Sequence, residues 1–253
     1  MDRIFEGKVA IVTGGSFGIG RATAVAFAKR GARVVIADWL EDKEGETLKQ
    51  IKNAGSEGLF VQCDVSKIKE VSAMVEKTIA TYGRLDFAFN NAGIEGSSAK
   101  THECTEENWD KTIGINLKGV WLCMKMEIPH ILNQGKGAIV NCASVAGLDG
   151  FVGLPSYVAS KHGIVGLTKT AALEYARLGI RVNAVCPGVI HTAMVDRITG
   201  EDKEAEKQFI GLEPIGRMGT PEEVGEAVVW LCSDAASFVT GIAMPVDGAF
   251  SAQ

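Results

Sequence analysis

The sequence has no apolar run of the length that crosses a membrane and no run of lysine or arginine residues. A membrane-spanning helix needs about 20 predominantly apolar residues, so we predict no membrane partner. Acidic residues number 31 and basic residues 26, which gives a formal net charge of −5. Because nucleic-acid binding needs clustered positive charge, this balance predicts no nucleic-acid partner.

Cysteine pairs of the kind that hold metals are missing as well. The six cysteines are scattered, with no C-x-x-C pair, and several lie within apolar runs. That pattern favours buried thiols in a reducing compartment over disulfides or a zinc site. The charged N-terminal stretch MDRIFEGK is unlike a signal peptide. We therefore expect a cytoplasmic protein without a metal ion.

What the sequence does contain is a regular alternation of short apolar runs, rich in valine and isoleucine, with longer amphipathic segments. The predicted strands are Lys8–Thr13, Arg33–Asp38, Gly58–Cys63, Leu85–Asn90, Gly137–Ala143, Ile180–Cys186 and Ile242–Val246. The predicted helices are Ile19–Lys29, Lys43–Ala54, Ile68–Tyr82, Glu106–Asn133, Tyr157–Leu178 and Pro221–Ser233.

This alternation predicts an α/β protein with a doubly wound parallel sheet of about seven strands, the Rossmann-type arrangement. Runs that are apolar throughout, such as AIVNCA, indicate strands covered by helices on both faces. No linker or repeat divides the chain, so we expect a single domain over residues 1–253. The stretch at about 189–218 has helical segments and no predicted strand. A long connection after a strand predicts a lid over a binding site.

The first predicted strand ends in TGGSFGIG, Thr13 to Gly20, directly before the first helix. Within it, Gly14–Gly18 matches G-x-S-x-G, the turn that presents the nucleophilic serine of a hydrolase. That enzyme needs an oxyanion-hole loop after an earlier strand, and Ser16 follows the first strand of the chain, so we reject the hydrolase. In a doubly wound sheet, the same turn meets the pyrophosphate of a dinucleotide at the helix N-terminus.

Three glycines suit a dinucleotide. Gly14 permits the tight turn, Gly18 lets the backbone approach a phosphate, and Gly20 lets the helix pack close to the strand. Ser16 is then a turn residue whose hydroxyl can help to hold the phosphate. The second strand ends at Asp38, whose carboxylate can accept hydrogen bonds from the adenosine ribose of NAD and would repel the 2′-phosphate of NADP. We therefore predict NAD as the cofactor.

The stretch SYVASK places Tyr157 and Lys161 at i and i+4, on one face of a predicted helix. Tyrosine is ordinarily a poor base at neutral pH, but a neighbouring ammonium favours the phenolate. Such a tyrosine can accept the proton of an alcohol. Ser144 follows the fifth strand, at the edge of the sheet where ligands bind, and its hydroxyl can bond to a substrate oxygen.

With these residues in place, the chain resembles the short-chain dehydrogenases/reductases over nearly its whole length. The matching stretches are TGGSFGIG, Asp38, CDV at Cys63–Val65, NNAG at Asn90–Gly93, Asn116 in GINLKG, Ser144, YVASK, CPGVIHT at Cys186–Thr192 and VDG at Val246–Gly248. Two departures are visible. Ala249 stands where many relatives have a second glycine, and Phe17 stands where NADP-preferring members often have a basic residue.

The resemblance implies a catalytic tetrad of Asn116, Ser144, Tyr157 and Lys161. Tyr157 would be the general acid/base, with Lys161 holding the nicotinamide ribose and tuning Tyr157. Ser144 would orient the substrate oxygen, and Asn116 would hold a water that relays the proton through Lys161. A homotetramer, formed through paired long helices and C-terminal strands, is also expected by resemblance.

The same motifs supply the expected cofactor contacts. Asp64 and Val65 would contact adenine, Asn91 would line the groove, and Ile190 and Thr192 would hold the carboxamide. The other expected cofactor residues are Phe17 and Ile19 in the glycine turn, Trp39 after Asp38, Ala92 and Gly93 in NNAG, and Pro187 and Gly188 in CPG, together with Tyr157 and Lys161.

We predict a small-molecule substrate, a hydrophobic secondary alcohol or ketone, by similarity to members that oxidise ring alcohols and diols. Glu95, Phe151 and Met194 are the predicted pocket residues beside Ser144 and Tyr157. Three alternatives stay open: a 3-oxoacyl carrier reductase using NADPH, a glucose or other sugar 1-dehydrogenase, and a non-catalytic cofactor-sensing protein. Asp38, Phe17 and the negative net charge argue against the first, and the complete tetrad argues against the last.

Overall fold

The computed structural model describes residues 2–40, 45–200 and 202–252. The strands are β1 Val9–Thr13, β2 Arg33–Asp38, β3 Gly58–Gln62, β4 Phe87–Asn90, β5 Gly137–Cys142, β6 Ile180–Pro187 and β7 Ala243–Val246. The α-helices are α1 Gly18–Lys29, α2 Glu46–Asn53, α3 Ile68–Tyr82, α4 Glu106–Ile113, α5 Gly119–Gln134, α6 Pro155–Tyr175, α7 Ala193–Thr199, α8 Lys203–Leu212 and α9 Pro221–Cys232.

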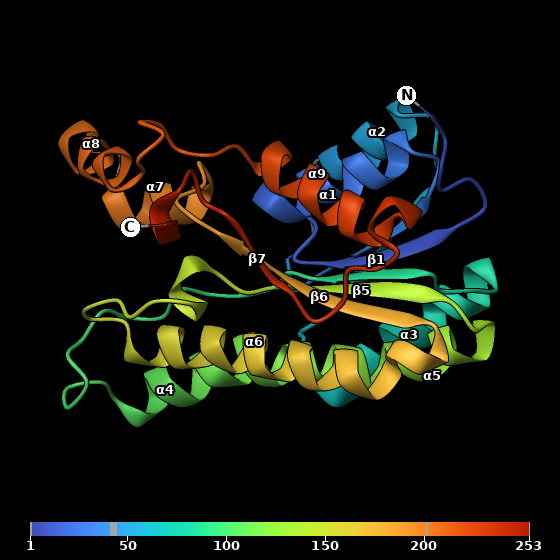
Figure 1. Ribbon diagram of the computed structural model, residues 1–253, viewed down its shortest axis with the longest axis horizontal. Coiled ribbons are helices and arrows are strands. Elements are labelled where there is room, and N and C mark those ends of the chain that lie inside the picture. Colours follow the sequence, from blue (N-terminus) through green and yellow to red (C-terminus); the bar gives the residue numbers. More distant parts are fainter. Residues whose placement is uncertain (1, 41–44, 201, 253) are drawn as a thin grey trace.

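The seven strands form one parallel sheet in the order β3-β2-β1-β4-β5-β6-β7. The order reverses between β1 and β4, so this is the predicted doubly wound sheet. Helices α1, α2 and α9 cover one face, and α3, α4, α5 and α6 lie on the other (Figure 1). Ligands of such sheets bind beyond the carboxyl ends of the strands, at the reversal.

Two apolar clusters hold the layers together, as strands that are apolar on both sides require. Ile11 and Ile139 face the layer of α3, α5 and α6, while Val12 and Val140 face α1 and α9. Every residue of β1 and β5 is buried. Five of the six free cysteines are buried too, and Cys104 is half-buried, so the prediction of buried thiols is confirmed for those five.

The largest difference from the predicted elements lies in the segment Glu106–Asn133. It is not one regular helix, because a π-helical turn at Gly114–Lys118 separates α4 from α5. Most other boundaries shift by one or two residues: β3 ends at Gln62, β4 begins at Phe87 and α6 begins at Pro155. Helix α6 ends at Tyr175, three residues before the predicted Leu178, and a 3-10 turn over Ala176–Leu178 follows it. The predicted start of the second helix, Lys43, lies outside the described residues.

Two segments gather beyond one end of the sheet, where α7, α8 and the C-terminal residues lie together (Figure 1). The 189–218 segment contains α7 and α8. A parallel bridge joins Ile190, near its start, to Gly219, the residue that follows its end. After β7, the Asp247 carboxylate accepts hydrogen bonds from the Ala249 and Ser251 amides and shapes the final turn. In the described parts of the chain, no helix has the length and apolar character needed to cross a membrane.

Ala249 has a φ of +75°, a left-handed conformation that glycine adopts without strain. A Cβ in this region costs about 1–2 kcal/mol, partly offset by the greater freedom of glycine in the unfolded chain. We expect Ala249→Gly to raise the free energy of unfolding by about 1 kcal/mol in urea titrations. Ala54, with φ of −74°, is the control, and Ala54→Gly should lower it. If Ala249→Gly lowers the free energy of unfolding as much as Ala54→Gly does, the backbone at Ala249 is not strained.

Candidate active site

The glycine turn between β1 and α1 has the open backbone that a phosphate needs. Gly14 and Gly18 have positive φ angles of 62° and 50°. A Cβ on Gly20 would overlap the carbonyl oxygen of Gly14, so only glycine fits there. Phe17 precedes α1 without a side-chain cap, and the first turn carries no acidic residue. Neither a capping side chain nor an acidic side chain of the first turn therefore occupies the N–H groups at the start of α1, which fits a bound pyrophosphate.

Asp38 ties the end of β2 to the glycine turn. Its carboxylate is buried and accepts hydrogen bonds from the backbone amides of Ser16 (3.1 Å) and Leu40 (3.2 Å). The Ser16 hydroxyl, also buried, donates to the Leu40 carbonyl at 3.2 Å. Ser16 thus braces the turn in this structure, and its predicted role in holding a phosphate stays a prediction.

The NNAG motif after β4 supports the same turn from the other side. The Asn91 amide group donates to the carbonyls of Thr13 (3.1 Å) and Gly14 (3.2 Å). In return, the Thr13 hydroxyl accepts the backbone N–H groups of Asn91 (2.9 Å) and Ala92 (3.1 Å). Asn91 is therefore a brace of the predicted cofactor groove through its side chain.

The residues expected around the adenosine lie at the ends of β2 and β3. Trp39 is exposed, and Phe17 is half-exposed with the Arg21 guanidinium 5.3 Å from its ring centroid. Val65 is buried. The Asp64 carboxylate accepts hydrogen bonds from the amide and hydroxyl of Ser66 and pairs with the Lys67 ammonium at 3.2 Å. These contacts hold the Asp64 side chain in place.

Tyr157 and Lys161 lie together on α6, as their spacing predicts. The Lys161 ammonium is 5.5 Å from the centroid of the Tyr157 ring. It is buried and donates to the Cys142 carbonyl at the end of β5, over 2.8 Å. A charge-assisted bond of this kind fixes the ammonium beside the phenol ring.

Asn116 sits within the π-helical turn, a distortion that is common at functional sites. Its side chain accepts from the Ile94 amide (2.8 Å) and donates to the Ile94 carbonyl (2.9 Å) and to the Ser160 hydroxyl (3.2 Å). Ser160 in turn donates to the Tyr157 carbonyl at 2.7 Å. This chain of bonds connects Asn116 to the helix that carries Tyr157.

Gly93 and Gly147 show how closely the predicted tetrad is packed. A Cβ on Gly93 would lie 3.2 Å from the Asn116 amide oxygen and 3.7 Å from the Lys161 ammonium, so both side chains reach one point. Ser144 begins the short turn Val145–Gly147, and its hydroxyl accepts the Ala146 amide at 3.2 Å. A Cβ on Gly147 would lie 2.8 Å from the Lys161 carbonyl, so this turn packs directly against α6.

The segment after β6 crosses the glycine turn. A Cβ on Gly18 would lie 3.2 Å from the Thr192 methyl group, so Thr192 covers the start of α1. The Gly188 amide donates to the Val246 carbonyl at 3.1 Å, which extends the pairing of β6 and β7 beyond Pro187. Ile190 is buried.

Of the three predicted pocket side chains, two have partners that the sequence did not reveal. Glu95 forms a double ion pair with Arg197 of α7, with N–O distances of 3.2 and 3.3 Å. Phe151 stacks on Phe250 of the C-terminal turn, with ring centroids 5.7 Å apart. Met194 is half-buried on α7. Arg197 and Phe250 were missed because no local spacing rule connects residues so far apart in sequence.

Comparison with known proteins agrees with this geometry. Residues 14–251 match the family model described as enoyl-(acyl carrier protein) reductase. The chain is 44% identical over 253 residues to cyclohexanol dehydrogenase from Acinetobacter sp. (strain SE19), which covers 100% of this chain and 98% of the relative. The chain belongs to the short-chain dehydrogenase/reductase family.

Two further members of the family are similar to this short-chain dehydrogenase/reductase over nearly its whole length. It is 43% identical to 2,5-dichloro-2,5-cyclohexadiene-1,4-diol dehydrogenase from Sphingobium indicum, over 98% of both chains. The crystal structure of levodione reductase superposes with a TM-score of 0.95 at 39% identity, over 98% of this chain and 99% of that one. The family uses a nicotinamide cofactor, and the glycine turn and Asp38 fit one.

A buried polar cluster lies beneath the predicted active site of this short-chain dehydrogenase/reductase. The Asn90 amide group donates to the carboxylate of Glu127 and to the amide oxygen of Asn141, both over 3.1 Å. Asn141 donates to the Thr168 hydroxyl at 3.0 Å. Asn90 precedes Asn91, and Asn141 precedes Cys142, so the cluster supports both the glycine turn and the carbonyl that holds Lys161.

Glu127 makes this cluster sensitive to pH. Its carboxyl is fully buried, and this burial raises its pKa to about 7, against an opposing hydrogen bond from Asn90. The folded protein therefore binds this proton more tightly than the unfolded chain. The resulting stability is complete below the unfolded value of 4.5 and is lost as the pH rises through about 7.

Between pH 5 and 8, we expect the free energy of unfolding of the wild-type protein to fall by about 2.5 kcal/mol more than that of Glu127→Gln, because glutamine stays neutral. Urea unfolding at both pH values measures this difference. Glu174→Gln, at an exposed position on the neighbouring helix α6, should behave as wild type. An equal pH dependence in wild type and Glu127→Gln would show that Glu127 is charged in the folded protein.

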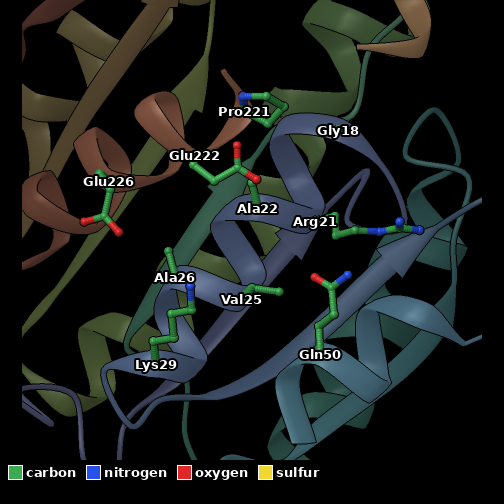
Figure 2. Close-up of a pocket in the computed structure, with 10 residues that line it drawn as sticks. All are labelled: Gly18, Arg21, Ala22, Val25, Ala26, Lys29, Gln50, Pro221, Glu222 and Glu226. Atoms are coloured by element: carbon green, nitrogen blue, oxygen red, sulfur yellow. The ribbon is translucent and has the colours of Figure 1, made fainter. Parts of the chain in front are cut away.

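A hollow of about 290 Å³ lies outside this site, on the outer side of α1 (Figure 2). It runs between α1 and α9, with Gln50 of α2 at its border, and Gly18 is the only glycine-turn residue that lines it. None of the four predicted catalytic residues reaches this hollow. Across residues 2–40, 45–200 and 202–252, no group of three or more metal-ligating side chains occurs.

Proposed function

We propose that the protein is an NAD-dependent secondary alcohol dehydrogenase that interconverts a ring alcohol and its ketone, with Tyr157 as general acid/base. The observation that supports this most is the convergence of Asn116 and Lys161 near Gly93, with the Tyr157 ring 5.5 Å from the Lys161 ammonium. A hydroxyl group bound there would meet a phenol, an ammonium and, from the turn packed against α6, a serine.

In the oxidation, the Tyr157 phenolate takes the proton from the substrate hydroxyl. The Lys161 ammonium stabilises the phenolate, and the bond to Cys142 holds that ammonium in place. Ser144 donates to the substrate oxygen. Asn116 holds a water that carries the proton onward. A bound nicotinamide supplies the acceptor for the hydride of the carbinol carbon. Gly14 to Gly20, Asp38, Asp64, Val65 and Pro187 to Thr192 would hold the cofactor.

The preference for NAD rests on Asp38. Its buried carboxylate ends β2 and is fixed by the amides of Ser16 and Leu40, so it cannot turn away from a ribose. A 2′-phosphate would bring a second negative charge against it. This argues against the alternative 3-oxoacyl carrier reductase that uses NADPH. A cofactor-sensing protein without catalysis has no need of a complete tetrad.

A ring alcohol is the proposed substrate because the relatives named above act on cyclohexane and cyclohexadiene rings according to their names. In this proposal Phe151 would supply an apolar wall and Met194 an apolar cover, whereas a sugar would need more polar partners. We propose that the 189–218 segment is the lid of this site. The pair of Glu95 with Arg197 would then hold the lid to the loop after β4.

We propose that the protein is cytoplasmic, has a single domain and forms a homotetramer, and its exposed apolar side chains support this assembly. Trp121 on α5 is 44% exposed and Leu173 on α6 is 85% exposed. These are the two long helices that, by the family resemblance, we expect to pair between subunits. Phe238 and Ile242, just before β7, are exposed as well. Exposed apolar side chains mark an interface where they form one continuous patch, and we propose that these residues do so in the assembled protein.

Initial rates of NADH formation at 340 nm test the proposal. The panel contains cyclohexanol, cyclohexanediols, linear secondary alcohols and glucose, each with NAD and with NADP. We expect the highest kcat/KM with a ring alcohol and NAD. A higher kcat/KM with glucose would instead support a sugar dehydrogenase. A higher kcat/KM with NADPH and a 3-oxoacyl thioester, in the reverse direction, would support a 3-oxoacyl carrier reductase.

A further inference from the structure

The proposed lid is closed at its base by backbone pairing. The Gly219 amide donates to the Val189 carbonyl, and the His191 amide donates to the Gly219 carbonyl, both over 2.9 Å. Past α8, the Ile215 amide donates to the Gly248 carbonyl at 3.1 Å. The base of the lid is therefore hydrogen-bonded both to the segment that follows β6 and to the turn that follows β7.

Glu213 lies between these two contacts, at the end of α8. Its side chain is buried, and one carboxylate oxygen accepts the Val189 amide over 2.6 Å. A Cβ on Gly188 would lie 2.6 Å from that oxygen, so the carboxylate packs directly on the backbone of the segment. The bond thus connects the exit of the lid to the segment expected to hold the carboxamide.

The second Glu213 oxygen is buried without a hydrogen-bond partner in the described protein. It lies near Gly248, and Glu213 is one of the residues that line a cavity of about 110 Å³ under the lid base. Arg217 lines the same cavity, but its guanidinium pairs with Glu223. Burial accordingly raises the pKa of Glu213, and the nearby Asp247 adds to this rise. A buried carboxyl without a cation costs free energy, so core packing alone does not account for a glutamate here.

We propose that Glu213 is a positioning residue for the nicotinamide: its bond to the Val189 amide sets the Pro187–Ile190 backbone and couples that backbone to the position of the lid. This inference rests on the proposed function, because it assumes that Pro187 to Thr192 hold the carboxamide. It adds a residue that the family resemblance did not supply. The coupling predicts that losing the Glu213 carboxyl weakens cofactor binding without removing any group that touches the substrate.

Glu213→Ala is expected to raise the Kd of NADH about tenfold in fluorescence titrations, which is the effect of losing one charge-assisted hydrogen bond. The KM for NAD should rise by a similar factor, while kcat should change less than about threefold. Glu213→Gln keeps an oxygen for the Val189 amide and should bind NADH within about threefold of wild type. Glu204→Ala, at an exposed position in the same lid, is the matched control and should not change the Kd.

Hydrogen exchange provides a second measurement, which uses the wild-type protein and needs no variant. We expect NADH to slow exchange in the peptides 187–192 and 210–216 together. An unchanged rate in 210–216 would overturn the coupling, as would a folded Glu213→Ala protein with the wild-type Kd. A Glu213→Gln protein that binds as weakly as Glu213→Ala would overturn the role of the Val189 bond.

Failure of this inference is distinguishable from failure of the proposed function. The binding and exchange experiments need NADH but no alcohol substrate and no turnover. Normal NADH binding in Glu213→Ala with normal ring-alcohol oxidation by wild type removes only the positioning role. Absence of NADH binding in wild type removes the cofactor assignment itself, and the positioning role with it.

Discussion

Replacing Tyr157 with phenylalanine will lower kcat for a ring alcohol by about 10³-fold, within the range of general acid/base catalysis. The phenol is the only group that we assign to take the substrate proton, and phenylalanine keeps the ring beside the Lys161 ammonium while removing the hydroxyl. NADH should bind with nearly the wild-type Kd, because the contacts of the glycine turn and Asp38 are unchanged. Stopped-flow rates and NADH fluorescence measure the two effects separately.

Tyr175→Phe is the matched control, since Tyr175 is the last residue of the same helix. It should keep the wild-type kcat. Retained turnover in Tyr157→Phe would assign the base to another residue. A loss of NADH binding as large as the loss of kcat would mean that the substitution disturbs the site as a whole.

Replacing Asp38 with asparagine will raise the ratio of kcat/KM with NADP to kcat/KM with NAD by about 10²-fold. Two like charges about 5 Å apart repel by about 3 kcal/mol at an effective dielectric constant of about 20. Asparagine removes this repulsion and keeps a side-chain oxygen for the Ser16 or Leu40 amide. Initial rates with both cofactors give the ratio directly.

Asp149→Asn controls for the change in net charge, because Asp149 is exposed and lies outside the predicted cofactor residues. Its ratio should equal that of wild type. A wild-type enzyme that already prefers NADP would contradict the ribose argument. An unchanged ratio in Asp38→Asn would show that the carboxylate does not set the preference.

The fold, the glycine turn and the closeness of Tyr157 to Lys161 were predictable because local patterns encode them. Strands that are apolar on both faces, alternating with amphipathic helices, are compatible with few topologies other than a parallel, doubly wound sheet. The i, i+4 spacing alone places Tyr157 beside Lys161. The position of Gly14, Gly18 and Gly20 between the first strand and the first helix predicts the turn that the structure has.

The contacts between distant segments were not predictable from the sequence. The pair of Glu95 with Arg197 joins residues 102 positions apart, and no periodicity connects them. Glu213 follows a charged stretch, and nothing in the sequence distinguishes it from an exposed surface residue. In the folded chain it is buried and accepts the Val189 amide. The π-helical turn around Asn116 occurs where its side chain bonds to Ile94 and Ser160, and helical periodicity reveals neither the turn nor these bonds.

The most direct test of the account follows one deuterium atom. Wild-type enzyme, NAD and cyclohexanol deuterated at the carbinol carbon are mixed, and the nicotinamide product is examined by mass spectrometry and NMR. The account predicts that each NADH carries the deuterium at C4 of the ring, while the ketone has lost it. NADH formed without deuterium, or no reduction of NAD by any secondary alcohol, would contradict it.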